Sequence, residues 1–167
     1  MKQNEGWVSL LNLQLAQQNA PYTIVNASIS GETTAGGLSR LPGILSSQKV
    51  DYLLIELGGN DGLRGFPPAL IKNNLLQLIN LAKKEDIPVF IMKIRIPPNY
   101  GPRYNDLFMA VFDQVAQETD IVALPFFMTE IAPDSHLMQA DGIHPNIEAQ
   151  PLIADFMEKM LSTIVVP

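Results

Sequence analysis

The sequence predicts an α/β fold in which a parallel sheet carries helices on both faces. Short runs of β-branched and apolar residues alternate along the chain with longer segments whose apolar residues recur at helical spacing. Such alternation is typical of strands joined by crossover helices, which makes the strands parallel. The chain has 167 residues, of which 47% are hydrophobic and 17% charged, so it is long and apolar enough for one domain with a sizeable core.

Strands and helices are expected to alternate in chain order. The expected strands are residues 22–27, 51–57, 88–94 and 121–124. The expected helices are residues 7–18, a segment after the loop at 28–34, and residues 67–84, 104–118 and 146–164, with Leu70 and Leu107 among the apolar residues at helical spacing. Pro42 lies in the second helix and should kink or restart it, because proline lacks the N–H of a helical hydrogen bond.

Polar loops follow the expected strands. Residues 28–34, 58–62 and 95–102 each come directly after a strand, and residues 141–146 come after the last one. Open parallel sheets bind ligands outside the carboxyl ends of their strands. We therefore expect these loops to converge on one rim of the sheet and to carry the functional residues.

The composition argues against several classes of function. The net charge is −6 without a cluster of Lys and Arg, so nucleic acid and anionic membrane surfaces are not expected as partners. The absence of cysteine excludes disulfides, thiolate metal sites and cysteine nucleophiles. No apolar run reaches transmembrane length, so no stable membrane insertion is expected, and the polar start at residues 1–5 is not a secretion signal.

Asp141 and His144 are candidates for an acid–base pair. An aspartate three residues before a histidine can accept the Nδ1 proton, which leaves Nε2 free as a general base. Gly142 would let the loop turn, and Pro145 would stiffen its exit into the last helix. A histidine near a helix start is also typical of a surface or capping residue. The pair therefore gains weight only together with other residues of the rim.

Gly31 and Asn60 are candidates for hydrogen-bond donors on the same rim. Gly31 lies between a strand and a helix, where the absence of Cβ lets its N–H point outward, although a plain turn glycine fits equally well. Asn60 follows the expected strand at 51–57, and its amide can donate into the rim or cap the next turn. With His144 and Asp141, these residues supply what acyl transfer requires, apart from a nucleophile.

Three motifs resemble the second, third and fifth blocks of the SGNH/GDSL hydrolase family. They are Asn-Ala-Ser-Ile-Ser-Gly-Glu-Thr at 26–33, Glu-Leu-Gly-Gly-Asn-Asp-Gly-Leu-Arg-Gly at 56–65 and Asp-Gly-Ile-His-Pro-Asn at 141–146. Ile-Pro-Pro-Asn-Tyr-Gly at 96–101 and Leu-Pro-Phe-Phe at 124–127 are similar to the branch of bacterial multifunctional thioesterases, lysophospholipases and arylesterases. The resemblance covers nearly the whole chain, with the motifs in family order.

The resemblance implies a three-layer α/β/α sandwich with a flavodoxin-like parallel sheet, acting on a small acyl ester or thioester without metal or cofactor. Gly31 corresponds to the family's backbone oxyanion donor, Asn60 to its side-chain donor, Asp141 to the triad acid and His144 to the base. The loop at 62–67 corresponds to a mobile lip of the acyl pocket, with residues 96–100 nearby. The pocket residues that this implies are Leu63, Arg64, Phe66, Pro97 and Tyr100. Related proteins are periplasmic or secreted, but the sequence itself does not give a compartment.

The family's first block, a strand followed by Gly-Asp-Ser-Leu with the nucleophilic serine, has no counterpart in the sequence. We therefore expect a single domain over residues 1–167, N-terminally truncated relative to the family, lacking the first strand and nearly inactive. Ser30 and Ser28 are possible substitute nucleophiles, although both hydroxyls could instead hold the loop by local hydrogen bonds. Unpaired strand edges invite pairing with another chain, so a homodimer or other self-association is expected.

Three hypotheses stay open from the sequence. The first is a serine ester or thioester hydrolase of arylesterase, thioesterase or lysophospholipase type. The second is a catalytically inactive, acyl-binding or self-associating remnant of the same fold. The third is a metal site formed by His136, Asp141 and His144, which ranks last because two histidines and carboxylates in one stretch are common by chance.

Overall fold

The computed structural model describes residues 3–165, which divide into two compact units. The first unit takes the described residues of Met1–Asn26 and Phe127–Pro167, and the second is Ala27–Phe126. Helices and a parallel sheet make up the structure, which confirms the predicted α/β class. No helix among the described residues is both long enough and apolar enough to cross a membrane.

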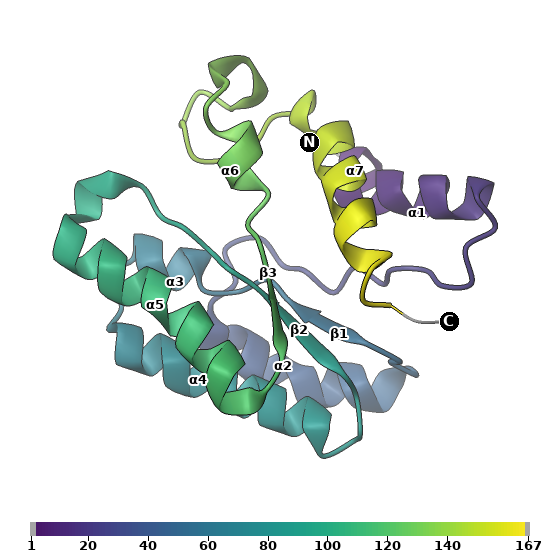
Figure 1. Ribbon diagram of the computed structural model, residues 1–167, viewed down its shortest axis with the longest axis horizontal. Coiled ribbons are helices and arrows are strands. Elements are labelled where there is room, and N and C mark those ends of the chain that lie inside the picture. The colour runs from purple at the N-terminus through teal and green to yellow at the C-terminus, as the bar shows by residue number, and fades with distance from the viewer. Residues whose placement is uncertain (1–2, 166–167) are drawn as a thin grey trace. The chain divides into compact units, whose positions relative to one another are not determined.

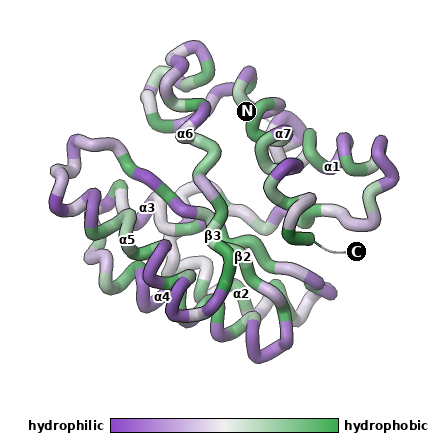
Figure 2. The backbone as a smooth tube through the Cα atoms, in the orientation of Figure 1, coloured by the Kyte–Doolittle hydropathy of each residue, from purple (hydrophilic) through white to green (hydrophobic). Residues whose placement is uncertain are grey.

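The second unit contains a parallel sheet of β1 (Leu53–Ile55), β2 (Val89–Met92) and β3 (Val122–Leu124) in the order β1-β2-β3. In the register of the sheet, Leu54 lies opposite Phe90 and Ile91 opposite Ala123. Every residue of β2 is buried, as its unbroken apolar sequence predicts for a central strand. Figure 2 shows the strands as hydrophobic segments. Within the described residues β1 pairs only with β2, so β1 is an edge strand.

The helices of the second unit form a layer on one face of the sheet. The layer consists of α2 (Thr34–Ser47), α4 (Pro68–Lys83) and α5 (Pro102–Thr119), while the short helix α3 (Gly59–Leu63) follows β1 and a 3-10 turn, η2 (Pro98–Tyr100), precedes α5. Figure 1 shows α2, α4 and α5 side by side, and α4 and α5 contact β2. Both α4 and α5 begin with proline, which suits the first helical turn because its N–H groups have no partner there.

Two details of these helices differ from expectation. The helix α2 continues through Pro42, so the predicted restart does not occur. Burial of Leu41 and the packing of α2 against α4 hold the helix together despite the missing hydrogen bond. Leu70 and Leu107 are 45% and 53% exposed, although both belong to the apolar residues that recur at helical spacing.

The first unit is built on two long helices from opposite ends of the chain. They are α1 (Trp7–Gln17) and α7 (Ala149–Leu161), which pack against each other. Leu11 and Leu15 of α1 and Ile153 and Met157 of α7 are buried. Three short helical segments complete this unit. The segment η1 (Gln3–Glu5) precedes α1, and α6 (Met128–Ile131) and η3 (Ser135–Leu137) precede α7.

The predicted strand at residues 22–27 does not form. Asn12 of α1 takes both backbone groups of Ile24: its Oδ1 accepts the N–H at 2.8 Å and its Nδ2 donates to the carbonyl at 2.7 Å. Val25 is 62% exposed. A β-branched run favours extended backbone but becomes a strand only beside a partner, and here a side chain satisfies the backbone instead.

Candidate active site

The loop before α7 brings His144 and Asp141 together, as their spacing predicts. His144 Nδ1 and Asp141 Oδ2 lie 2.7 Å apart. The other carboxylate oxygen, Oδ1, accepts the backbone N–H of Ile143 at 2.9 Å and that of His144 at 3.0 Å. Gly142 has a φ of +65°, which allows the tight turn that these bonds require. The carboxylate therefore folds its own loop and orients the imidazole at the same time.

The electrostatics of this pair suit a base and its orienting acid. The backbone N–H of His144, its side chain and the N–H of Ile143 hold the pKa of Asp141 well below its usual range, because each stabilises the ionised carboxylate. An ionised Asp141 fixes the proton of the imidazole on Nδ1. The His144 side chain is 62% exposed, and Nε2 makes no hydrogen bond with any described residue. Nε2 is thus available to accept a proton.

Asn146 holds the loop from its other end, and sequence reasoning did not single it out. Its Oδ1 accepts the backbone N–H groups of Glu148 at 2.9 Å and Ala149 at 3.2 Å at the start of α7. Its Nδ2 donates to the carbonyl of His136 at 2.6 Å. An asparagine just before a helix is the signal that could have identified it, because this residue type often caps helix N-termini.

In the second unit, Gly31 and Asn60 lie on adjoining segments. Gly31 has a φ of +77°, is exposed, and its N–H has no hydrogen-bond partner among residues 3–165. Asn60 is the second residue of α3, after Gly59 and the left-handed Gly58 that precedes the helix, and its Nδ2 donates to the carbonyl of Glu32 at 3.0 Å. That bond uses one of the two amide hydrogens and leaves the other available.

The turn that contains Gly31 is held by two arginines. Arg64 Nη2 donates to the Gly31 carbonyl at 3.2 Å, and Arg40 Nη2 donates to the Ala27 carbonyl at 2.8 Å. Arg40 also pairs with Glu32 at 2.9 Å. Ser28 and Ser30 are exposed in this turn, and the Ser30 hydroxyl makes no hydrogen bond within the described part of the chain.

The residues predicted to line an acyl pocket come together from two loops. Tyr100 of η2 donates its hydroxyl to the carbonyl of Leu63 at 2.7 Å. Tyr104 at the start of α5 donates to the carbonyl of Phe66 at 2.6 Å, and Asn105 Nδ2 donates to the carbonyl of Pro97 at 3.2 Å. Tyr104 was not among the predicted residues. Burial raises its pKa, and the charge of Asp61 and the neighbouring Tyr100 raise it further, so it stays a hydroxyl donor.

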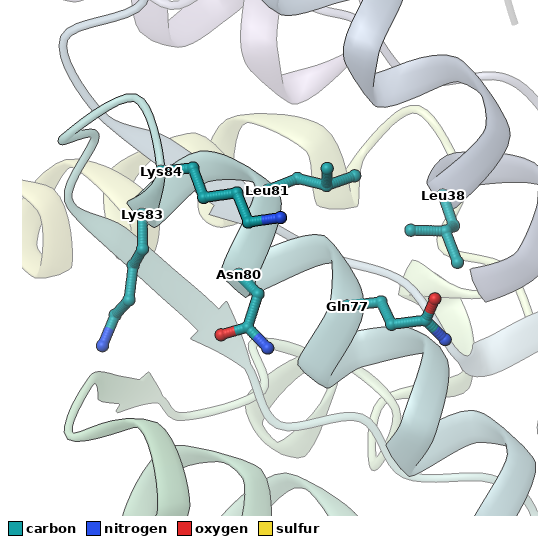
Figure 3. A pocket seen from close by; sticks show the side chains of 6 residues that line it. All are labelled: Leu38, Gln77, Asn80, Leu81, Lys83 and Lys84. Atoms are coloured by element: carbon teal, nitrogen blue, oxygen red, sulfur yellow. The ribbon is translucent and has the colours of Figure 1, made fainter.

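A hollow lies between α2 and α4 of the second unit (Figure 3). Its lining consists of Leu38, Gln77, Asn80, Leu81, Lys83 and Lys84. None of them is a predicted site residue. The described residues also contain no group of three His, Cys, Asp or Glu side chains placed to hold a metal ion.

The chain matches the model of the GDSL-like Lipase/Acylhydrolase family over residues 2–150. It is 46% identical over 152 residues to Esterase TesA of Pseudomonas aeruginosa, covering 91% of this chain and 76% of that protein. It is 45% identical over 165 residues to Thioesterase 1/protease 1/lysophospholipase L1 of Escherichia coli, covering 99% of this chain and 78% of that protein.

A solved structure is also similar. The psychrotrophic esterase EstA from Pseudoalteromonas sp., determined in a form inhibited by monoethylphosphonate, matches with a TM-score of 0.96 and 44% identity. The match covers 98% of this chain and 89% of that chain. The fold is therefore that of these esterases.

Proposed function

The chain belongs to the GDSL-like lipase/acylhydrolase family, as its motifs predicted, and is an ester hydrolase; we propose that it cleaves small carboxylic esters or acyl thioesters by a Ser-His-Asp mechanism. The observation that carries this proposal is the 2.7 Å contact between His144 Nδ1 and Asp141 Oδ2, with Nε2 left without a partner among the described residues. The relatives' names, esterase and thioesterase, support both substrate classes.

Each residue of the proposed mechanism has one task. His144 Nε2 takes the proton of a serine hydroxyl, whose oxygen attacks the acyl carbon, and later returns the proton to the leaving alcohol or thiol. Asp141 keeps the imidazole oriented and stabilises the imidazolium. The Gly31 N–H and the remaining amide hydrogen of Asn60 donate to the oxyanion. In the second half of the reaction, His144 Nε2 takes a proton from water, whose oxygen attacks the acyl carbon. The proton then passes to the serine oxygen as the acid is released.

The nucleophile is the part of the mechanism that needs its own test. Ser30 and Ser28 are the serines in the turn that contains Gly31. We propose Ser30 before Ser28, because Ser30 adjoins the oxyanion glycine and its hydroxyl makes no hydrogen bond to a described residue. The loop at Leu63, Arg64 and Phe66, with Pro97 and Tyr100, is proposed to receive the acyl chain.

Phosphonate labelling tests the proposal directly, since EstA was solved in a form inhibited by monoethylphosphonate. The protein is treated with an activated ethyl phosphonate, and the adduct is located by peptide mass spectrometry. We expect one adduct, on Ser30, that disappears in Ser30→Ala and persists in Ser39→Ala, an exposed serine of α2. Hydrolysis of p-nitrophenyl acetate and of a short acyl thioester is measured in parallel.

A second candidate function is an inactive acyl-binding or self-associating member of the family. The outer edge of β1 favours it, because β1 pairs only with β2 within residues 3–165 and an unpaired edge can bind a strand of another chain. No adduct and no hydrolysis, together with a dimer by light scattering, would support this candidate over the hydrolase. A labelled, hydrolysing monomer would reject it.

A further inference from the structure

A buried carboxylate lies next to one proposed oxyanion donor and has no part in the mechanism above. Asp61 follows Asn60 in α3 and is 0% exposed, which is rare for aspartate and requires hydrogen-bond partners. Both partners belong to Thr34, the first residue of α2. Asp61 Oδ2 accepts the Thr34 backbone N–H at 2.9 Å, and Oδ1 accepts its hydroxyl at 2.5 Å. Asp61 therefore joins α3 to the start of α2.

The same hydroxyl extends the network to α4. Asn74 Nδ2 donates to Thr34 Oγ1 at 3.0 Å, and both residues are buried. The Thr34 hydroxyl thus accepts from one helix and donates to another. Because a buried polar group that loses its partner is costly, a satisfied network of this kind holds its members in one arrangement.

The network joins the two segments that carry the proposed donors of the oxyanion hole. Asn60 precedes Asp61, and Gly31 precedes Thr34 by three residues. The direct contacts of the turn with α3 run from Asn60 Nδ2 to the Glu32 carbonyl and from Arg64 to the Gly31 carbonyl. Arg64 is exposed, so water competes for its bond, whereas the bonds of Asp61 are shielded from water.

Close packing restrains α3 on its other side. A Cβ placed on Gly62 would lie 2.7 Å from Phe108 Cε2 and 2.8 Å from Ile96 Cγ2. The absence of a side chain at this position lets α3 approach α5 directly. With Thr34 on one side and Phe108 on the other, α3 has little room to shift.

We propose that Asp61, through Thr34 and Asn74, is a positioning residue for ester hydrolysis that holds the Gly31 turn and the Asn60 amide at one fixed separation. This inference rests on the proposed roles of Gly31 and Asn60. Two donors reach one oxyanion only if each lies about 2.7–3.1 Å from it, so a small change in their separation removes one bond. The oxyanion exists only in the transition state and the intermediate, so the loss falls on kcat and not on KM.

The test compares variants of nearly equal shape. Thr34→Val keeps the backbone N–H and removes the hydroxyl, Thr34→Ser restores the hydroxyl, and Asp61→Asn removes one acceptor oxygen. Rates on p-nitrophenyl acetate are divided by the folded fraction and measured well below the melting temperature. We expect Thr34→Val and Asp61→Asn to lower kcat about 10–100-fold with KM within about threefold, and Thr34→Ser to restore most of kcat.

A destabilised control separates positioning from stability. Ile79→Val removes a methyl group from a fully buried residue of α4 outside the network, and should lower the melting temperature without changing kcat. If Thr34→Val and Asp61→Asn behave like Ile79→Val, the network is only structural and the proposal is overturned.

A second readout does not depend on catalysis. In ¹⁵N NMR spectra, the Gly31 amide and the Asn60 side-chain amide should shift or broaden in Thr34→Val and return to their wild-type positions in Thr34→Ser. If the wild-type protein hydrolyses neither ester nor thioester, the proposed function fails and these signals alone decide the positioning role. Unchanged Gly31 and Asn60 signals in Thr34→Val would overturn it.

Discussion

The two groups of proposed catalytic residues are held in place by different kinds of contact. Asp141 and His144 lie three residues apart in one loop, with side chains that are 44% and 62% exposed. Asn60 is bonded to Glu32 from 28 positions away, beside a buried network that joins three helices. The first group depends on its local sequence, and the second depends on the packing of α2, α3 and α4.

This contrast separates substitutions that should change activity alone from substitutions that should change both activity and the free energy of unfolding. An exposed ion pair contributes little to the free energy of unfolding, because water and salt screen it. Substitution of the His144 side chain should therefore change activity and leave stability nearly unchanged. Substitutions around Asn60 and Asp61 should change both, because buried hydrogen bonds and close packing are lost together with the geometry of the donors.

The largest effect is expected for His144→Ala. Loss of the base should lower kcat by about 10⁴-fold or more, as removal of a triad base does. Because the side chain is exposed, the melting temperature should move by no more than about 2 °C. Both are measured on p-nitrophenyl acetate and by thermal unfolding.

His136→Ala is the matched control for that variant. His136 is also exposed, and its contacts run through its backbone to Asp134 and Asn146, so alanine keeps them. Full activity in His144→Ala, or equal loss in both variants, would contradict the assignment of the base.

Asp141→Asn should have the next largest effect, a fall in kcat of about 10³–10⁴-fold. The amide keeps the shape and one acceptor for the loop N–H groups, but it offers His144 Nδ1 a donor in place of the carboxylate oxygen. Asp134→Asn serves as control, because Asp134 caps η3 through a bond that asparagine can also make. A rate in Asp141→Asn within tenfold of wild type would speak against an orienting carboxylate.

Asn60→Ala should lower kcat by about 10²–10³-fold with KM nearly unchanged, because a donor to the oxyanion is removed. The melting temperature should also fall, since the bond to the Glu32 carbonyl is lost. Asn73→Ala, at an exposed position of α4, should change neither quantity. A rise in KM without a change in kcat would place Asn60 in substrate binding instead.

Gly62→Ala should have the smallest effect on catalysis and act mainly on stability. The added methyl group would overlap Phe108 and Ile96, at a cost of about 1–3 kcal/mol in the free energy of unfolding measured by urea. Gly43→Ala, in α2 with open space around its Cβ, should instead stabilise by about 0.5–1 kcal/mol. Equal stability of the two variants would show that α3 does not depend on the glycine.

Local patterns in the sequence predicted much of this protein. The short apolar runs that became β1, β2 and β3 were recognisable as strands of a parallel sheet, although only β2 is buried at every residue, and α1, α4, α5 and α7 follow their helical spacing closely. The contact of Asp141 with His144 was predictable for the same reason. Residues three apart in a tight turn are close whatever the rest of the chain does.

Tertiary structure decided what depends on partners distant in the chain. Residues 22–27 have the composition of a strand, but Asn12 takes the backbone of Ile24, and no pattern within the segment reveals that. Leu70 and Leu107 follow helical spacing yet are exposed, because spacing defines a helix face and not how far the neighbouring layer extends. In the sequence, Asp61 is a polar residue of an expected loop. Only the packing of three helices buries it against Thr34, which in turn bonds to Asn74. Sequence determines local geometry through short-range sterics and hydrogen bonds, whereas burial is a property of the assembled chain.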